Sequence, residues 1–182
     1  MTRPDHLVLY LSGRCNLACP YCYAAGVARG TVSAPALRRA LEGFAAAGPA
    51  APKFTVLGGE PLLCRERLYE ALRDIRRLFG QAPVHVFTNG LLLKKGEAAR
   101  LLRLGVKLAV SVTGSGDAGL APLLRVLPRP LRGRVSASLV AGPGGAAELP
   151  VALLRLEAAG FRSLAWSPDI TAAWSPAARK VL

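Results

Sequence analysis

Apolar residues along this chain occur in short runs, which alternate with longer segments whose apolar positions recur at helical spacing. The short runs are typical of buried strands in a parallel sheet, and the longer segments are typical of amphipathic helices that cover such a sheet. The predicted strands are His6–Leu11, Lys53–Leu57, Pro83–Thr88, Lys107–Val112, Arg134–Ala141 and Ser163–Ser167, and the predicted helices are Ala34–Gly48, Arg65–Phe79, Lys94–Leu104, Ala118–Leu127 and Ala146–Ala159.

This alternation predicts an α/β fold built from repeated βα units around a parallel sheet. A doubly wound open sheet and a partial barrel both satisfy the order of elements. In either fold, functional residues gather at the carboxyl ends of the strands. The segments that follow the predicted strands hold the least ordinary residues of the chain, namely SGRCNLACPYCY, GGEP, TNG, SVTG, AGPGG and WSPD.

Length and composition narrow the class of protein. The 182 residues predict a single domain, 1–182, with a substantial core. Hydrophobic residues make up 52% of the chain, yet no uninterrupted apolar run is long enough to cross a membrane. Charged residues stand just before the first apolar run, so no secretory signal is expected. We therefore expect a cytoplasmic protein without a membrane partner.

The net charge of +13 has two explanations, which the sequence leaves open. A basic surface favours anionic partners such as RNA, acidic peptides or phosphorylated metabolites. Alternatively, a GC-rich or heat-adapted genome places arginine on solvated helix faces. Nucleic acid is possible but not favoured as a partner, because no aromatic residues are interleaved with the basic ones to stack on bases.

Three of the four cysteines, Cys15, Cys19 and Cys22, follow the first predicted strand in a C-x3-C-x2-C spacing. In a reducing compartment, clustered thiols indicate metal ligands. Three thiolates from one loop can hold three corners of a four-iron cube and leave the fourth iron open to a cofactor. Two alternatives use Cys64 as a fourth ligand: a tetrahedral zinc site or an electron-transfer cluster. GGEP and the other strand-end motifs favour the open cluster.

The segment CNLACPYC, together with GGEP (58–61) and TNG (88–90), resembles the radical S-adenosylmethionine (radical SAM) superfamily over essentially the whole chain. This resemblance implies a partial (β/α)6 TIM-type barrel of parallel strands. It also implies a [4Fe-4S] cluster held by Cys15, Cys19 and Cys22, with SAM on the open iron. An electron from a reductant such as flavodoxin or ferredoxin would cleave SAM into methionine and a 5′-deoxyadenosyl radical, which takes a hydrogen atom from the substrate.

The resemblance further implies which residues contact SAM. Gly58 and Gly59 would let the backbone approach the methionine moiety, and Glu60 would face its ammonium group. The remaining implied contacts are Pro61, in the same motif, Tyr21 with Val140 or Leu139 and Trp166 beside the adenine, Ser111 or Thr113 at the ribose hydroxyls, and Asn89 at the floor of the SAM site.

The chain also departs from the pattern of peptide-modifying relatives. These often carry Asp-Gly after the fourth strand, where this chain has Thr113-Gly114, and they continue into a cysteine-rich domain with auxiliary clusters. Only Cys64 remains here, so we expect a single cluster. The short barrel and the basic surface favour a peptide or protein substrate, in peptide maturation or glycyl-radical activation. The alternatives are a small nucleotide-like substrate, as in carboxy-deazaguanine synthases, RNA, or a non-catalytic iron–sulfur redox sensor.

Other polar residues have ordinary interpretations. His6 and His85 lie in or next to predicted strands and are interpreted as structural histidines. Cys64 is interpreted as a buried or idle thiol, and less readily as a hydrogen-atom donor. Asp117 and Asp169 lie in predicted loops and are weak candidates for substrate contact.

Overall fold

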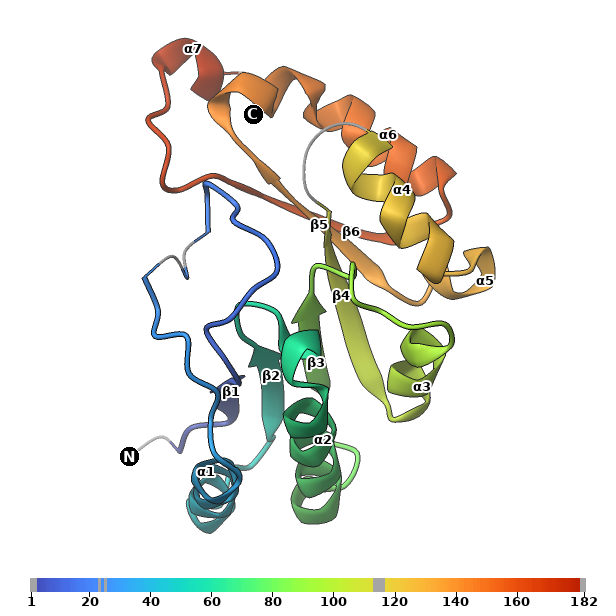
Figure 1. Cartoon of the computed structure of the whole chain (residues 1–182). Coiled ribbons are helices and arrows are strands. Elements are labelled where there is room, and N and C mark those ends of the chain that lie inside the picture. Colours follow the sequence, from blue (N-terminus) through green and yellow to red (C-terminus); the bar gives the residue numbers. More distant parts are fainter. Residues whose placement is uncertain (1–2, 23, 25, 113–116, 181–182) are drawn as a thin grey trace. The chain divides into compact units, whose positions relative to one another are not determined.

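A computed structural model describes residues 3–22, 24, 26–112 and 117–180, and Figure 1 shows the arrangement of its elements. In this part of the chain the strands form one six-stranded sheet in the order β1-β2-β3-β4-β5-β6. The strands are β1 (His6–Tyr10), β2 (Lys53–Leu57), β3 (Val84–Thr88), β4 (Val106–Val112), β5 (Ser136–Ala141) and β6 (Ser163–Pro168).

Helices connect consecutive strands, as a parallel sheet requires. They are α1 (Ala34–Ala46), α2 (Arg65–Phe79), α3 (Glu97–Arg103), α4 (Asp117–Val126), α5 (Arg129–Arg132), α6 (Leu149–Ala158) and α7 (Pro176–Arg179), with two 3-10 helices, η1 (Pro61–Cys64) and η2 (Pro143–Glu148).

The predicted α/β class with six parallel strands is confirmed. The helix predicted at Arg65–Phe79 is confirmed at both ends. Other boundaries differ for local reasons. The third predicted helix starts at Glu97 rather than Lys94, because the Glu97 carboxylate accepts the backbone N–H of Lys94 at 2.9 Å and Gly96 adopts a φ of 78°. The fifth begins as η2 and becomes α-helical only at Leu149.

The described residues belong to two compact units. The first is Met1–Ala18, Ala24–Thr88 and Leu101–Lys107, and the second is Cys19–Tyr23, Asn89–Arg100 and Leu108–Leu182. In the first unit, α1 and α2 pack side by side against one face of β1, β2 and β3 (Figure 1). The buried side chains of that core include Leu9, Leu37, Leu41, Phe44, Phe54, Val56, Leu68, Leu72, Ile75, Val84 and Val86.

Three aromatic rings lock the helices of the first unit onto its sheet. Phe54 of β2 meets Phe79 of α2 at a ring-centroid distance of 4.8 Å, and Phe44 of α1 stands edge-on to Phe54 at 5.6 Å. Such pairs add about 0.5–1.5 kcal/mol each beyond the burial of their area. The sheet face beneath α1 and α2 is therefore apolar and fixed. The opposite face of the sheet, which we call the open face, carries those residues of β1, β2 and β3 that alternate with the buried ones.

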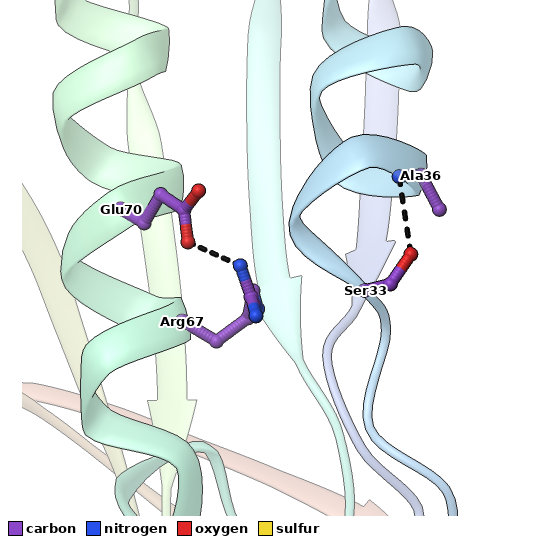
Figure 2. A network of polar contacts seen from close by, with 4 residues as sticks. All are labelled: Ser33, Ala36, Arg67 and Glu70. Atoms are coloured by element: carbon purple, nitrogen blue, oxygen red, sulfur yellow. Dashed lines mark hydrogen bonds and ion pairs between the residues drawn. The ribbon is translucent and has the colours of Figure 1, made fainter.

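Polar contacts fix the start of α1 and the surface of α2 (Figure 2). The Ser33 hydroxyl accepts the backbone N–H of Ala36 at 3.3 Å, so Ser33 is the N-cap of α1, as its position before Pro35 predicts. On α2, Arg67 forms an ion pair with Glu70 one turn later.

In the second unit, β5 pairs with both β4 and β6 in parallel register. One face of β5 is buried, at Ala137, Leu139 and Ala141, and α6 packs beside β6. Every residue of β6 exposes more than one third of its surface to solvent. Among the described residues no helix is both long and apolar enough to span a bilayer.

Part of the basic excess has a structural use. The Arg76 guanidinium donates to the carbonyl oxygens of Leu104, Ala82 and Gly105 at 3.0, 2.6 and 3.1 Å. The Arg132 guanidinium likewise donates to three carbonyl oxygens at the ends of its neighbouring helices. Guanidinium groups satisfy several orphan carbonyls at once, so these two arginines hold turns together rather than bind a partner.

Candidate active site

The segment that leads into the cysteine loop is held on one side by the GGE motif. Gly59 donates its backbone N–H to the Ser12 carbonyl at 2.7 Å, and Glu60 donates to the Arg14 carbonyl at 2.8 Å. These bonds extend the pairing of β1 and β2 beyond Tyr10, up to the residue before Cys15. The position of Cys15 therefore depends on the GGE motif.

The other side of this segment is held by residues after the loop. Thr31 bridges to Ser12 in antiparallel fashion, and its hydroxyl donates to the Ser12 hydroxyl at 3.2 Å. Gly13 donates its N–H to the Gly30 carbonyl at 3.2 Å. Ser12 is only 2% exposed. The loop that carries the cysteines is thus closed at its base by hydrogen bonds.

Both glycines of the motif are required by backbone contact. A Cβ atom at Gly58 would lie 2.6 Å from the Ser12 carbonyl oxygen, and one at Gly59 would lie 2.4 Å from that of Arg14. Neither distance is tolerated by real Cβ atoms, and the opposing atoms are backbone, which cannot rotate away. The sequence predicted that these glycines allow close backbone approach. The structure identifies a partner in that approach, the start of the cysteine loop.

Glu60 is fully buried, at 0% exposure. Its Oε1 accepts the backbone N–H of Leu62 at 2.9 Å, which caps η1, and the Thr88 hydroxyl of β3 at 2.7 Å. A buried carboxyl group needs such donors because burial removes its hydration. Pro61, also buried, begins η1. Thr88 was missed as a site residue, although it stands in the TNG motif.

Cys15 is exposed, and its Sγ accepts the backbone N–H of Leu17 at 3.4 Å. Cys64 is half-buried, and its thiol donates to the Pro61 carbonyl at 3.4 Å. Burial raises the pKa of the Cys64 thiol, and the nearby Arg14 only partly offsets this. A thiol with a raised pKa is a poor nucleophile and a poor metal ligand, which agrees with the interpretation of Cys64 as an idle thiol.

In the second unit, Cys19 and Cys22 belong to a single turn, in which the N–H of Cys22 donates to the Cys19 carbonyl at 3.1 Å. Burial raises the pKa of Tyr21, between them, to about 12, and Cys19, Cys22 and Asp169 add to the rise. The two thiols and the Asp169 carboxylate therefore lie within electrostatic range of the Tyr21 phenol. Anionic neighbours oppose ionisation of a phenol, so Tyr21 stays neutral.

Asp169 is a buried residue just after β6, at 9% exposure. Its carboxylate accepts from both the N–H and the hydroxyl of Thr171, and its carbonyl accepts the indole N–H of Trp174 at 2.7 Å. These bonds give Asp169 a structural task in the loop after β6. Sequence reasoning treated Asp169 as a weak candidate for substrate contact.

The remaining predicted SAM contacts lie on different faces. Ser111 is exposed and Val140 half-buried, each on the face opposite its buried strand neighbours. Trp166 pairs in register with Leu139, which is buried, so the two lie on the same face and Val140 on the other. The Asn89 Oδ1 accepts the N–H of Leu91 at 3.0 Å. Thr113 lies outside the described residues.

Within each unit, the described residues hold no group of three or more His, Cys, Asp or Glu side chains arranged as a metal site. The assignment of Cys15, Cys19 and Cys22 as joint ligands therefore stays a prediction from their spacing. What the structure adds is the secured base of the loop and the packed glycines beneath it.

A family model described as Radical SAM superfamily matches residues 9–136. A curated relative, a GTP 3′,8-cyclase of Lactiplantibacillus plantarum (strain ATCC BAA-793 / NCIMB 8826 / WCFS1), is 36% identical over 96 residues, which are 50% of this chain and 28% of the relative.

Solved structures share the fold at low sequence identity. Native anSMEcpe with bound AdoMet and Cp18Cys peptide superposes with a TM-score of 0.73 at 17% identity, over 91% of this chain and 51% of that one. BtrN in complex with AdoMet and 2-DOIA gives a TM-score of 0.52 at 22% identity, over 61% of this chain and 47% of that one. The chain thus spans about half the length of these structures or less. The likeness confirms the predicted partial TIM-type barrel fold.

Proposed function

The chain belongs to the radical SAM superfamily, and from that premise we propose that it cleaves SAM reductively and directs the resulting radical at a peptide or protein substrate. One observation carries the proposal. The GGE motif is hydrogen-bonded to the backbone that leads into Cys15, and both of its glycines pack against that backbone. The GGE motif and the backbone at the start of the cysteine motif therefore form one structural unit.

In this proposal, Cys15, Cys19 and Cys22 hold a [4Fe-4S] cluster. When bound, a cluster there would supply SAM with an electron received from flavodoxin or ferredoxin. SAM would then be cleaved to methionine and a 5′-deoxyadenosyl radical, which would take a hydrogen atom from the substrate. The donor set suits this group, because thiolates are the ligands of iron–sulfur clusters and the loop bears no carboxylate among Cys15 to Cys22. Anionic thiolates also gain from Arg14 in the same loop.

The chain's own residues would bind and orient SAM. Gly58, Gly59 and Pro61 form the backbone surface for the methionine moiety, and Glu60 accepts its ammonium group. The other proposed contacts are Tyr21 and Val140 at the adenine, Ser111 or Thr113 at the ribose and Asn89 at the floor of the site. Trp166 lies on the face opposite Val140 and on the same face as Leu139, so it is proposed for the adenine together with Leu139 as the alternative to Val140.

A peptide or protein substrate is supported by the fold, since anSMEcpe, whose structure holds AdoMet and a peptide, shares it at a TM-score of 0.73. A nucleotide-like substrate is the second candidate, and the 36% identity to a GTP 3′,8-cyclase favours it. RNA and a non-catalytic redox sensor remain more distant alternatives. We also propose that residues 1–182 act as one domain, in the reducing cytoplasm that an iron–sulfur protein needs.

The direct test of SAM cleavage uses protein reconstituted with iron and sulfide without oxygen. After reduction by dithionite in the presence of SAM, we expect 5′-deoxyadenosine and methionine in equal amounts, measured by liquid chromatography and mass spectrometry. Protein kept oxidised is the control and should release neither. An intact, reducible cluster that produces no 5′-deoxyadenosine would contradict the proposal and favour the sensor.

A second prediction concerns the hydrogen bond from Thr88 to Glu60. Thr88→Val keeps the shape of the side chain and removes the donor, so Glu60 loses an interaction of about 1.5–3 kcal/mol. We expect the Kd for SAM to rise about tenfold or more, measured by isothermal titration calorimetry without reductant. Thr88→Ser keeps the hydroxyl and should bind SAM nearly as well as the wild type.

Thermal unfolding separates this positioning role from a general loss of stability. If Thr88→Val melted earlier but bound SAM with wild-type affinity, the hydrogen bond would serve folding only, and the assignment of Glu60 to SAM would lose its support.

A further inference from the structure

Four basic side chains stand in a row on the open face of the sheet, near the amino ends of the strands. We call them the basic row: His6 of β1, Lys53 of β2, His85 of β3 and Lys107 of β4. His6 pairs in register with Lys53, and Thr55 pairs with His85, so these side chains share one face.

Strand alternation places the other end of the row on the same face. His85 stands between Val84 and Val86, which are both fully buried beneath the helices. Lys107 stands between two residues that are 3% and 1% exposed, and is itself exposed. All four members of the row belong to the first compact unit.

The row gathers like charges without a counter-charge. Among the described residues, no carboxylate forms an ion pair with any of its four members. The nearest acid in sequence, Asp5, is engaged elsewhere, since its carboxylate accepts the backbone N–H groups of Ala50 and Ala51 at 2.7 and 3.1 Å. The hydroxyl of Thr55 lies 2.9 Å from His6 Nε2 and adds a neutral polar group.

His85 lies within electrostatic range of two other members of the row. Burial lowers the pKa of His85, and Lys107 and His6 lower it further. The groups that act on His85 are Lys107 on β4 and His6 on β1. Its register partner is Thr55 on β2, and Lys53 lies two residues before Thr55 on the same face. Like charges held together destabilise a fold unless something compensates. An anion bound across the row would supply that compensation.

The open face beyond the row is apolar. Val8, which follows His6 by two residues, is 51% exposed, and Phe87, which follows His85 by two, is 39% exposed. Further along the strands of the first unit come the GGE motif and Cys15. At about 3.3 Å per residue, the four steps from His6 to Tyr10 span about 13 Å. A ligand that follows the strands would therefore meet cations, then apolar side chains, then the GGE motif.

We propose that the basic row binds the anionic oxygens of the substrate, as carboxylate or phosphate, while the reacting part of the substrate lies at the carboxyl ends of the strands. This inference depends on the proposed function in one respect only, namely that the bound anion is part of the substrate. A carboxylate would come from an acidic residue of a peptide, and a phosphate from a nucleotide.

The test uses the two imidazoles as reporters, because the chain contains only two histidines. Proton NMR of the full chain with its oxidised cluster follows both imidazole signals across pH, assigned with His6→Gln and His85→Gln. One arm adds pyrophosphate and the other adds a blocked tri-glutamate peptide, at constant ionic strength. We expect one of the two anions to raise the pKa of His85.

Linkage fixes the sign of the pH dependence. An anion binds the protonated imidazole more tightly, so the pKa rises on binding and the affinity is greatest at low pH. The affinity should fall as the pH rises through the pKa of the bound state. Lys107→Gln should weaken binding about tenfold at pH 6.5, the size expected for one lost charge-assisted bond. Arg39→Gln removes the same charge from the exposed surface of α1 and should bind like the wild type.

The outcomes distinguish a phosphate from a carboxylate ligand, and they distinguish failure of the basic row from failure of the proposed function. A response to pyrophosphate alone supports a nucleotide phosphate, and a response to the peptide alone supports a carboxylate. No response to either, or equal weakening by Lys107→Gln and Arg39→Gln, overturns the basic row as a site. Neither measurement requires SAM cleavage. Absence of 5′-deoxyadenosine with intact anion binding would refute the proposed function alone.

Discussion

Replacing any one of Cys15, Cys19 and Cys22 by alanine is expected to remove the iron–sulfur cluster and with it all SAM cleavage. Each substitution leaves an iron without its thiolate. Loss of a ligand should reduce activity by more than the roughly 10- to 100-fold that follows from changing a residue around a metal site. Iron and sulfide analysis, the visible absorption of the reconstituted protein and the yield of 5′-deoxyadenosine check this expectation.

Cys64→Ala is the matched control, because it removes a thiol from the same unit as Cys15. The raised pKa of Cys64 and its bond to the Pro61 carbonyl argue against a thiolate ligand. We expect this variant to retain its cluster and its activity. Loss of the cluster in Cys64→Ala would instead support one of the four-cysteine alternatives, zinc or an electron-transfer cube, according to the metal found in the wild type.

Gly59→Ala should disable the site without touching a metal ligand. The added Cβ would lie 2.4 Å from the Arg14 carbonyl oxygen and 2.9 Å from that of Gly13. Relief of this clash must move the backbone that leads into Cys15, at a cost of about 1–3 kcal/mol. We expect poor cluster retention and a fall of about 10- to 100-fold in SAM cleavage per protein. Cluster content and 5′-deoxyadenosine yield are the measurements.

Gly43→Ala controls for the loss of a glycine. Gly43 lies inside α1, and a Cβ there would meet nothing within 4 Å. Alanine favours a helix by up to about 1 kcal/mol over glycine, so this variant should be as stable as the wild type or more so, and fully active. If Gly59→Ala kept its cluster and activity as Gly43→Ala does, the coupling between the GGE motif and the cysteine loop would be wrong.

The sequence was sufficient where one physical signal dominated. The stripe of apolar residues from Leu68 to Phe79 predicted α2 at both of its ends. The strands were placed to within two residues because each is a compact apolar run, and β2 was predicted without error. The parallel order of the sheet then followed from the alternation of strands and helices.

Boundaries that depend on single backbone hydrogen bonds in the adjoining turn were harder to predict. β5 begins at Ser136 rather than Arg134, because Arg134 and Val135 still donate to the carbonyls of Leu131 and Arg132 in the preceding turn. The short helix α5 and the 3-10 helices were missed because they lack any periodic pattern of their own.

The site shows the same limit. The motifs identified Gly58, Gly59 and Glu60 from the sequence. Only the structure shows that the Ser12 and Arg14 carbonyls contact the glycines. It also shows that the Thr88 hydroxyl, on another strand, donates to the Glu60 carboxyl group. Face assignments also need the register. Trp166 and Val140 both end strands in the sequence, yet their side chains lie on opposite faces because Trp166 pairs with Leu139.

The bridge between Ser12 and Thr31 has an evolutionary consequence. It joins the two stems of the cysteine loop. The positions of β1 and α1 therefore do not depend on how long the loop between the stems is. Insertions, deletions and new side chains can therefore accumulate between Cys22 and Gly30, outside the C-x3-C-x2-C spacing, while the scaffold keeps its register. In such an architecture, the reach of the loop toward a new substrate can diversify independently of the barrel that supports it.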